Sequence, residues 1–159
     1  MTVFVAAHSI EVRTSLVHGR GVYASRRLLK GTSIGLYGGR RYTSEQLLKV
    51  DWYKRHGGMT YLFSLSDGTT IDGAQGGNAT RFLNHCCEPN CEAVEEVGED
   101  GQFHLRVVTT KTIVVGAELF IDYALIIDES ETPEAYRCRC GTSTCRGSMA
   151  VMPFKSTPT

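Results

Sequence analysis

The sequence has 159 residues, of which 42% are hydrophobic and 21% charged, as expected for one globular domain with a small appendage. No apolar run approaches the roughly 20 residues of a transmembrane helix, and the opening MTVFVAAHSIEV lacks the basic start of a signal peptide. We therefore expect an intracellular protein with reduced thiols and no membrane partner.

The formal net charge is zero, but the two halves of the chain differ. Residues 1–80 hold ten Lys/Arg against five Asp/Glu, and residues 81–159 hold seven against twelve. The acidic stretches 88–101 and 128–134 are either solvated loops or a field that attracts a basic partner. The chain has no basic stripe with interleaved aromatic residues, which argues against direct binding of nucleic acid.

Short runs with strand character, separated by Gly, Asp and Asn, predict a mainly β fold. In chain order they are TVFVAA (2–7), SIEVRTSLV (9–17), GVYAS (21–25), SIGLYGG (33–39), TYLFSL (60–65), TTIDG (69–73), FHLRVVTT (103–110) and IVVGAELFIDY (113–123). The pair Asp67-Gly68 predicts a hairpin, and a second hairpin is expected across residues 95–105.

One helix is expected over residues 43–58, TSEQLLKVDWYKRHGG. Thr43 or Ser44 is the expected cap, and Gly57-Gly58 is the expected end. The apolar face would begin with Leu47, Leu48 and Val50.

The Gly-x-Gly of HGRGVYA (18–24) lies just before an expected strand. It is either a plain tight turn or a place where backbone approaches a ligand closely. It does not match the dinucleotide-binding fingerprint, because no third glycine opens a helix.

The stretch RFLNHCCEPNC (81–91) places a histidine beside two cysteines. Strand geometry disfavours a catalytic pair of His85 with Cys86 or Cys87, because adjacent side chains of an extended segment point to opposite faces.

Cys138, Cys140 and Cys145 form a C-x-C-x4-C cluster. In an extended segment the first two project to the same face, and a turn at Gly141 can return the third. Structural zinc takes four ligands, so the fourth must be Cys86, Cys87, Cys91 or one of the five histidines. A disulfide with spare thiols is the alternative, which a reducing compartment disfavours.

Five stretches together resemble the SET-domain protein-lysine methyltransferases, in order, over residues 8–149. They are HGRGVYA, SIGLYGG, YLFSLSDGTTIDGAQGGNATRFLNHCCEPNC, GAELFIDYA and CRCGTSTCRGSM. The last resembles a post-SET zinc segment, and without a cysteine-rich pre-SET block the chain looks like a minimal, stand-alone member. The resemblance implies a SET domain over 8–127, a post-SET segment over 134–150 and a flexible tail over 151–159.

The implied fold is a β-clip of several small curved sheets with a knot-like threading of the C-terminal motif. This threading would bring RFLNHCC beside FIDYA.

The resemblance also implies S-adenosylmethionine as methyl donor, one structural zinc ion and a set of site residues. The backbone of Gly19, Arg20 and Gly21 would approach the methionine moiety of the cofactor. Arg81, Asn84 and His85 would hold the rest of the cofactor, with Asn84-His85 as a backbone turn. Met149 would pack near adenine. Tyr123 would be the active-site tyrosine, and Tyr37 and Ile121 would line the lysine channel with it. Cys87 would complete the zinc site with Cys138, Cys140 and Cys145, leaving Cys86 and Cys91 as ordinary buried or half-buried thiols.

The implied reaction needs a neutral lysine amine, although free lysine titrates near pH 10.4. A narrow channel lined by rings would favour the uncharged amine, so the expected mechanism is positioning plus desolvation, without a general base. Ile121 stands where the family often has Phe or Tyr, and since it has no hydroxyl we expect that more than one methyl group can be added.

The acidic second half favours a basic protein or peptide as substrate, with a histone tail first and a non-histone protein, such as a ribosomal one, second. An inactive zinc-stapled peptide-binding module is the alternative from another class, and a DNA-binding zinc protein is disfavoured by the neutral net charge. Location follows the substrate: nucleus and chromatin in a eukaryote or for a host-directed protein, and cytoplasm otherwise. The sequence carries no signal for an oligomeric state.

Overall fold

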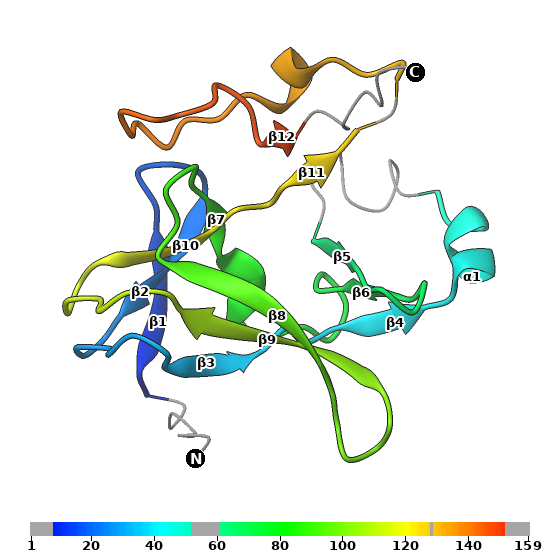
Figure 1. Ribbon diagram of the computed structural model, residues 1–159, viewed down its shortest axis with the longest axis horizontal. Coiled ribbons are helices and arrows are strands. Elements are labelled where there is room, and N and C mark those ends of the chain that lie inside the picture. The colour runs from blue at the N-terminus through cyan, green and yellow to red at the C-terminus, as the bar shows by residue number, and fades with distance from the viewer. Residues whose placement is uncertain (1–7, 52–60, 128, 152–159) are drawn as a thin grey trace, which may run out of the picture.

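Four small β-sheets form the described part of the chain, which comprises residues 8–51, 61–127 and 129–151 of the computed structural model (Figure 1). In chain order the elements are β1 (Ile10–Thr14), β2 (Arg20–Ala24), β3 (Ser33–Leu36), β4 (Arg40–Tyr42), α1 (Ser44–Leu48), β5 (Leu62–Ser64), β6 (Thr70–Asp72), η1 (Ala79–Phe82), β7 (Asn84–His85), β8 (Cys91–Val97), β9 (Phe103–Thr109), β10 (Glu118–Ile121), β11 (Leu125–Ile126), η2 (Pro133–Tyr136) and β12 (Ala150–Val151). The expected mainly β fold is confirmed.

The largest sheet has the strand order β1-β2-β10-β7, and the others have the orders β3-β9-β8, β4-β6-β5 and β11-β12. Side chains of β2, β9 and β10 meet in one core, where Val22, Val107 and Leu119 are fully buried. In β9 every second residue from Leu105 is buried, as expected for a strand with one face on the core.

Both expected hairpins are confirmed. Strands β5 and β6 pair in antiparallel fashion across Asp67-Gly68, where Gly68 has φ +84° and the Asp67 carboxylate accepts the Thr69 N–H at 2.9 Å. Strands β8 and β9 pair from Cys91↔Thr109 to Val97↔Phe103.

The helix is much shorter than expected. Thr43 caps it as predicted, in a capping box with Gln46, but α1 ends at Leu48 and has no buried residue. The predicted apolar face is therefore wrong: among the described residues none of the α1 side chains is buried, and a short helix without packing is marginal. The expected end at Gly57-Gly58 lies outside the described residues, as does the expected first strand, 2–7.

The run IVVGAELFIDY is not one strand. Ile113 forms an isolated bridge with Leu28, and Gly116 turns the chain at φ +85° into β10. A single extended strand could not serve both pairings.

The expected backbone turn at Asn84-His85 is also wrong, because these residues form β7. It runs parallel to β10, with Phe120 opposite Asn84 and Ile121 opposite His85. RFLNHCC consequently lies beside FIDYA, as expected.

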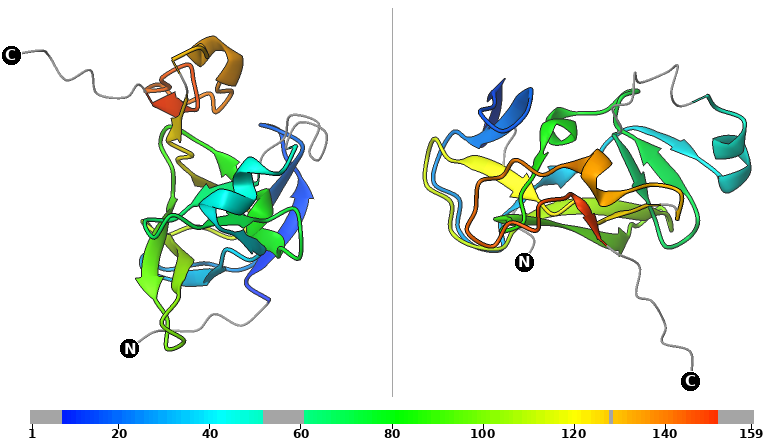
Figure 2. Two further views of the ribbon diagram at one scale, coloured as in Figure 1. Left: turned by 90° about the vertical axis from the view of Figure 1, so that its right-hand side faces the viewer. Right: turned by 90° about the horizontal axis from the view of Figure 1, so that it is seen from above.

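The C-terminal segment, residues 129–151, stands apart from the main β body in Figure 1 and in the left view of Figure 2. Strand β12 joins it to the body by parallel pairing with β11, Leu125↔Ala150 and Ile126↔Val151. Val151 thus belongs to a strand and not to the expected tail, whose remaining residues, 152–159, lie outside the described part. No helix among the described residues is long and apolar enough to cross a membrane.

Replacing Leu119 with Ala tests the central position of β10. Because Leu119 is fully buried between β2 and β7, we expect the free energy of unfolding in urea to fall by about 2–5 kcal/mol. The matched control is Leu48→Ala in α1, where the side chain is 89% exposed and the expected change is within about 0.5 kcal/mol. Equal losses in both variants would contradict this view of the core.

Candidate functional site

Tyr37 and Tyr123 line one cavity of about 330 Å³. Tyr37 follows β3 and Tyr123 follows β10, which belong to different sheets. Ile121 and Arg81 line it as well. The full lining is Tyr37, Tyr61, Leu62, Phe63, Ser64, Thr80, Arg81, Leu83, Ile121, Tyr123, Ala124, Leu125 and Ile126. The cavity thus brings together four of the residues that the sequence singled out.

Backbone carbonyls fix both phenols. The Tyr37 hydroxyl donates to the carbonyl oxygen of Tyr61 at 2.7 Å, and the Tyr123 hydroxyl donates to that of Leu83 at 2.6 Å. Because each proton is engaged in this way, the lone pairs of each phenol oxygen remain available to accept a hydrogen bond.

The cavity disfavours positive charge. Its described lining contains one cation, Arg81, and no Asp, Glu or His. Burial raises the pKa of Tyr123 to about 12 and also raises the pKa of Tyr37, so both phenols stay neutral near pH 7. An amine that enters would lose hydration without finding a counter-ion, and this favours its uncharged form.

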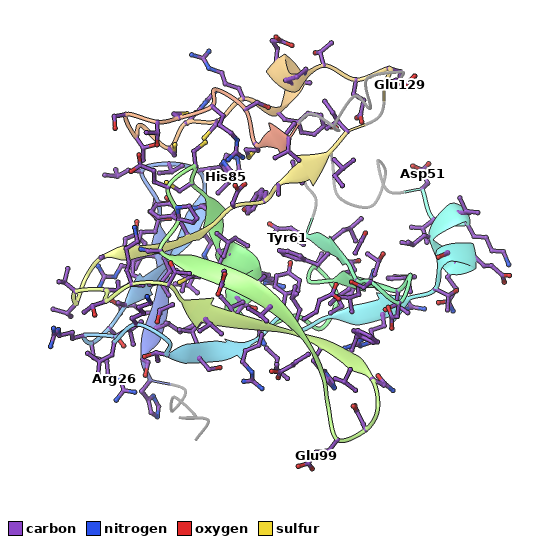
Figure 3. The ribbon with its side chains drawn as sticks, in the orientation of Figure 1. Arg26, Asp51, Tyr61, His85, Glu99 and Glu129 are labelled. Atoms are coloured by element: carbon purple, nitrogen blue, oxygen red, sulfur yellow. The ribbon has the colours of Figure 1, made fainter. Side chains whose placement is uncertain are left out.

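Tyr61 is a cavity residue that sequence reasoning missed. Tyr61 lies just before β5 (Figure 3); its carbonyl oxygen orients the Tyr37 hydroxyl, and Tyr61 also lines the cavity. The available signal was an aromatic residue at the head of the run TYLFSL, which reads equally well as ordinary strand composition.

The Gly-x-Gly turn leads into β2 and is held by Asn84. Gly19 has φ +48°, which favours glycine, and a Cβ added to it would meet no atom of the described residues within 4 Å. The Asn84 side-chain nitrogen lies 3.1 Å from the His18 carbonyl oxygen and 2.9 Å from that of Arg20. The Asn84 side chain therefore holds the turn, while the surface of Gly19 stays open. The Arg20 guanidinium lies over the Phe82 ring, with its central carbon 4.5 Å from the ring centroid.

Gly21 packs closely against the Glu118 carboxylate. A Cβ at this position would lie 2.1 Å from Oε1 of Glu118.

His85 links the cavity to the cysteine cluster. Its Nδ1 accepts the backbone N–H of Tyr123 at 3.0 Å, so the ring proton of the neutral form lies on Nε2, 3.4 Å from the Cys87 sulfur. Burial lowers the pKa of His85, which agrees with a neutral ring. Figure 3 shows His85 between the strands of the main body and the C-terminal segment. Its imidazole is thus fully engaged by the protein.

Four cysteine sulfurs, those of Cys87, Cys138, Cys140 and Cys145, lie within 4.8 Å of one another. Tetrahedral zinc with Zn–S bonds of about 2.3 Å requires sulfur–sulfur separations of about 3.8 Å. The Cys87 sulfur lies 3.7 Å from that of Cys138 and 3.9 Å from that of Cys145. The donor set therefore fits a structural zinc ion, with the His85 imidazole donating to one thiolate.

The other two cysteines stay outside this cluster. Cys91 is buried in the main core, and Cys86 is buried with its thiol donating to the Glu88 carbonyl.

Met149 connects the C-terminal segment to β11. Its N–H donates to the Tyr136 carbonyl at 2.8 Å, and its own carbonyl accepts the Leu125 N–H at 3.1 Å.

A second hollow, of about 470 Å³, adjoins the tyrosine cavity and shares Phe63, Ser64, Tyr123 and Ala124 with it. Its acidic lining residues are Glu92, Glu95 and Asp122, and its described lining contains no Lys, Arg or His. We call it the acidic groove.

The model of the SET domain family matches residues 19–124. Histone-lysine N-methyltransferase trithorax of Drosophila melanogaster is 34% identical over 138 residues, 86% of this chain and 4% of the relative. Histone-lysine N-methyltransferase SETD2 of Homo sapiens is 34% identical over 140 residues, 87% of this chain and 5% of the relative. The H3 lysine-4 specific histone-lysine N-methyltransferase of Kluyveromyces lactis is 33% identical over 137 residues, 84% of this chain and 13% of the relative. The chain thus spans only a small part of these relatives.

A solved structure supports the fold. A chain of ctPRC2, in an autoinhibited conformation bound to S-adenosylmethionine, superimposes with a TM-score of 0.67 at 23% identity, over 74% of this chain and 15% of that one. The expected SET-domain fold is thereby confirmed. Since the family model covers more than half of the sequence, from the Gly-x-Gly turn to the residue after Tyr123, the chain belongs to the SET-domain family.

Proposed function

We propose that this chain transfers methyl groups from S-adenosylmethionine to the ε-amine of a lysine in a basic protein, with a histone tail as the leading substrate. The observation that carries the proposal is the cavity between Tyr37 and Tyr123, which is uncharged apart from Arg81. The names of the relatives, histone-lysine N-methyltransferases, point to the same chemistry.

The residues around the Gly-x-Gly turn fit the cofactor. The open space over Gly19 leaves its backbone accessible, as a ligand that contacts main-chain atoms requires. The side chains of Asn84 and His85 are engaged inside the protein, so we assign their contacts with the cofactor to backbone atoms. Arg20, Gly21, Arg81 and Met149 complete the proposed binding set. S-adenosylmethionine, when bound, supplies a methyl group on a positively charged sulfur.

The chain contributes desolvation and orientation to the reaction. A lysine that enters the cavity leaves water and meets Arg81 as the one cation of the described lining, so its ammonium proton is given up to solvent water before methyl transfer. The phenol oxygens of Tyr37 and Tyr123 already donate to carbonyls and can accept the amine N–H, which aims the nitrogen lone pair. No carboxylate base is needed in this mechanism.

Ile121 bears on the number of methyl groups. It lines the cavity and has no hydroxyl with which to restrain a partly methylated amine. We therefore keep the proposal that more than one methyl group is added per lysine, which the masses of the product peptides report directly.

The acidic groove supports a basic substrate. Glu92 is exposed in it, while Glu95 accepts the Ser66 N–H at 2.9 Å and Asp122 pairs with Arg146 at 2.8 Å. Negative charge in a groove that adjoins the cavity would attract Lys and Arg residues that flank the target lysine. A histone substrate would place the chain at chromatin; another basic protein is the second candidate.

Replacing Tyr123 with Phe tests the proposed reaction. The variant keeps the ring and loses the oxygen that orients the amine, so we expect kcat for methylation of core histones to fall about 100-fold or more. Transfer of a radiolabelled methyl group measures the rate. Tyr42→Phe is the matched control. The Tyr42 hydroxyl accepts a hydrogen bond from Gln75 at 2.8 Å, and Tyr42 does not line the cavity. Full activity of Tyr123→Phe would refute the assigned role.

Replacing Cys140 with Ser tests the zinc site. We expect the variant to lose its zinc and amide hydrogen exchange to rise in β11 and β12, because the C-terminal segment depends on the metal for its folding. Metal content by atomic emission and exchange by mass spectrometry are the measurements. Cys86→Ser, next to a ligand but outside the cluster, should keep its zinc. Equal zinc loss in both variants would count against this ligand set.

A further inference from the structure

Glu118 is a half-buried carboxylate beneath the Gly-x-Gly turn, and all its hydrogen-bond donors are neutral. Ser15 and Tyr23 donate their hydroxyls to Oε2 at 3.0 and 3.1 Å. The amide of Asn84 donates to Oε1 at 2.9 Å. These bonds hold the carboxylate in place but leave its charge unneutralised.

No Lys, Arg or His of the described residues forms an ion pair with Glu118. Arg13 comes near, with its guanidinium 4.9 Å above the Tyr23 ring, but it pairs with Glu11. A carboxylate that is partly removed from water and lacks a counter-ion exerts its field over a longer range than a fully solvated one.

That field is directed at the proposed cofactor site. The Glu118 carboxylate lies so close to Gly21 that a Cβ at position 21 would displace it, and Asn84 donates to both the carboxylate and the turn. The Glu118 charge also acts on the tyrosine cavity. It raises the pKa of Tyr123, after the larger effects of burial and of Tyr61.

We propose that Glu118 makes the site charge-selective, holding the sulfonium cofactor more tightly than its uncharged thioether product. This inference rests on the proposed function. When the methyl group moves to the amine, the sulfur keeps the bonding electron pair and becomes neutral, and the positive charge leaves with the methylated lysine. Both forms share the same ammonium and carboxylate groups, so the sulfonium charge is what Glu118 discriminates. The spent cofactor is thereby released in favour of a fresh one.

Isothermal titration calorimetry of S-adenosylmethionine and S-adenosylhomocysteine against the wild type and Glu118→Gln tests this selectivity. Glutamine keeps the size and removes the charge. In Glu118→Gln we expect the affinity for the sulfonium form to fall about tenfold, which corresponds to a unit-charge interaction over on the order of 10 Å at an effective dielectric near 20. The affinity for the thioether should change less than about twofold.

Tyr23→Phe is the matched control, because it removes one neutral donor and keeps the charge; its effect on the two ligands should be equal. Equal weakening of both ligands by Glu118→Gln would overturn the charge-selective role and leave Glu118 as a purely positional residue. If the wild type bound neither ligand, the proposed function itself would fail, which is a separate result.

Arg13→Gln keeps the test decisive if Glu118→Gln does not fold, as judged by circular dichroism. This partly exposed side chain places a positive charge beside Tyr23. Its removal should raise the affinity ratio of the sulfonium form to the thioether by about twofold. An unchanged or lowered ratio would contradict the inference.

Discussion

Two residue pairs, Phe120 with Asn84 and Ile121 with His85, hold β7 parallel to β10. This short ladder joins segments that are far apart in sequence, and it sets three further contacts. The Leu83 carbonyl receives the Tyr123 hydroxyl, His85 Nδ1 receives the Tyr123 N–H, and Cys87 reaches the sulfurs of the C-terminal segment. The pairing of β7 with β10 therefore positions both the cavity and the metal site, and His85 contacts a residue of each.

Charge is distributed around the site in a way that serves the proposed chemistry. The described lining of the tyrosine cavity holds no carboxylate, whereas the adjoining groove presents Glu92 and Glu95. Glu118 adds a fixed negative charge beneath the turn at Gly19. In the proposed function, negative charge outside the cavity would attract the basic substrate and the positively charged donor, while the described lining of the cavity offers an ammonium ion no carboxylate.

Much of this site could be predicted from the sequence because its motifs are dense and ordered. The three terminal cysteines and the Asp67-Gly68 hairpin followed from spacing and turn chemistry alone. The choice of Cys87 over Cys86 and Cys91 needed the family resemblance, because the three are equally good donors until the fold orients them. The boundaries 8–127 and 134–150 stay predictions.

The features that sequence reasoning missed depend on tertiary contacts. The pair Asn84-His85 is too short to show strand periodicity, and only its partner β10 makes it a strand. Residues 43–58 show a helical pattern, but α1 ends at Leu48 and none of its side chains is buried against the described part of the chain. Tyr61 and Glu118 look like ordinary strand residues, and their roles follow from what lies opposite them in space.

A crystal structure with S-adenosylhomocysteine and a lysine peptide tests the central claim most directly. The account predicts that the thioether sulfur faces one end of the cavity while the lysine side chain enters from the acidic groove, its nitrogen lying between the hydroxyls of Tyr37 and Tyr123. A ligand bound away from the Gly-x-Gly turn, or a lysine that stays outside the cavity, would contradict it.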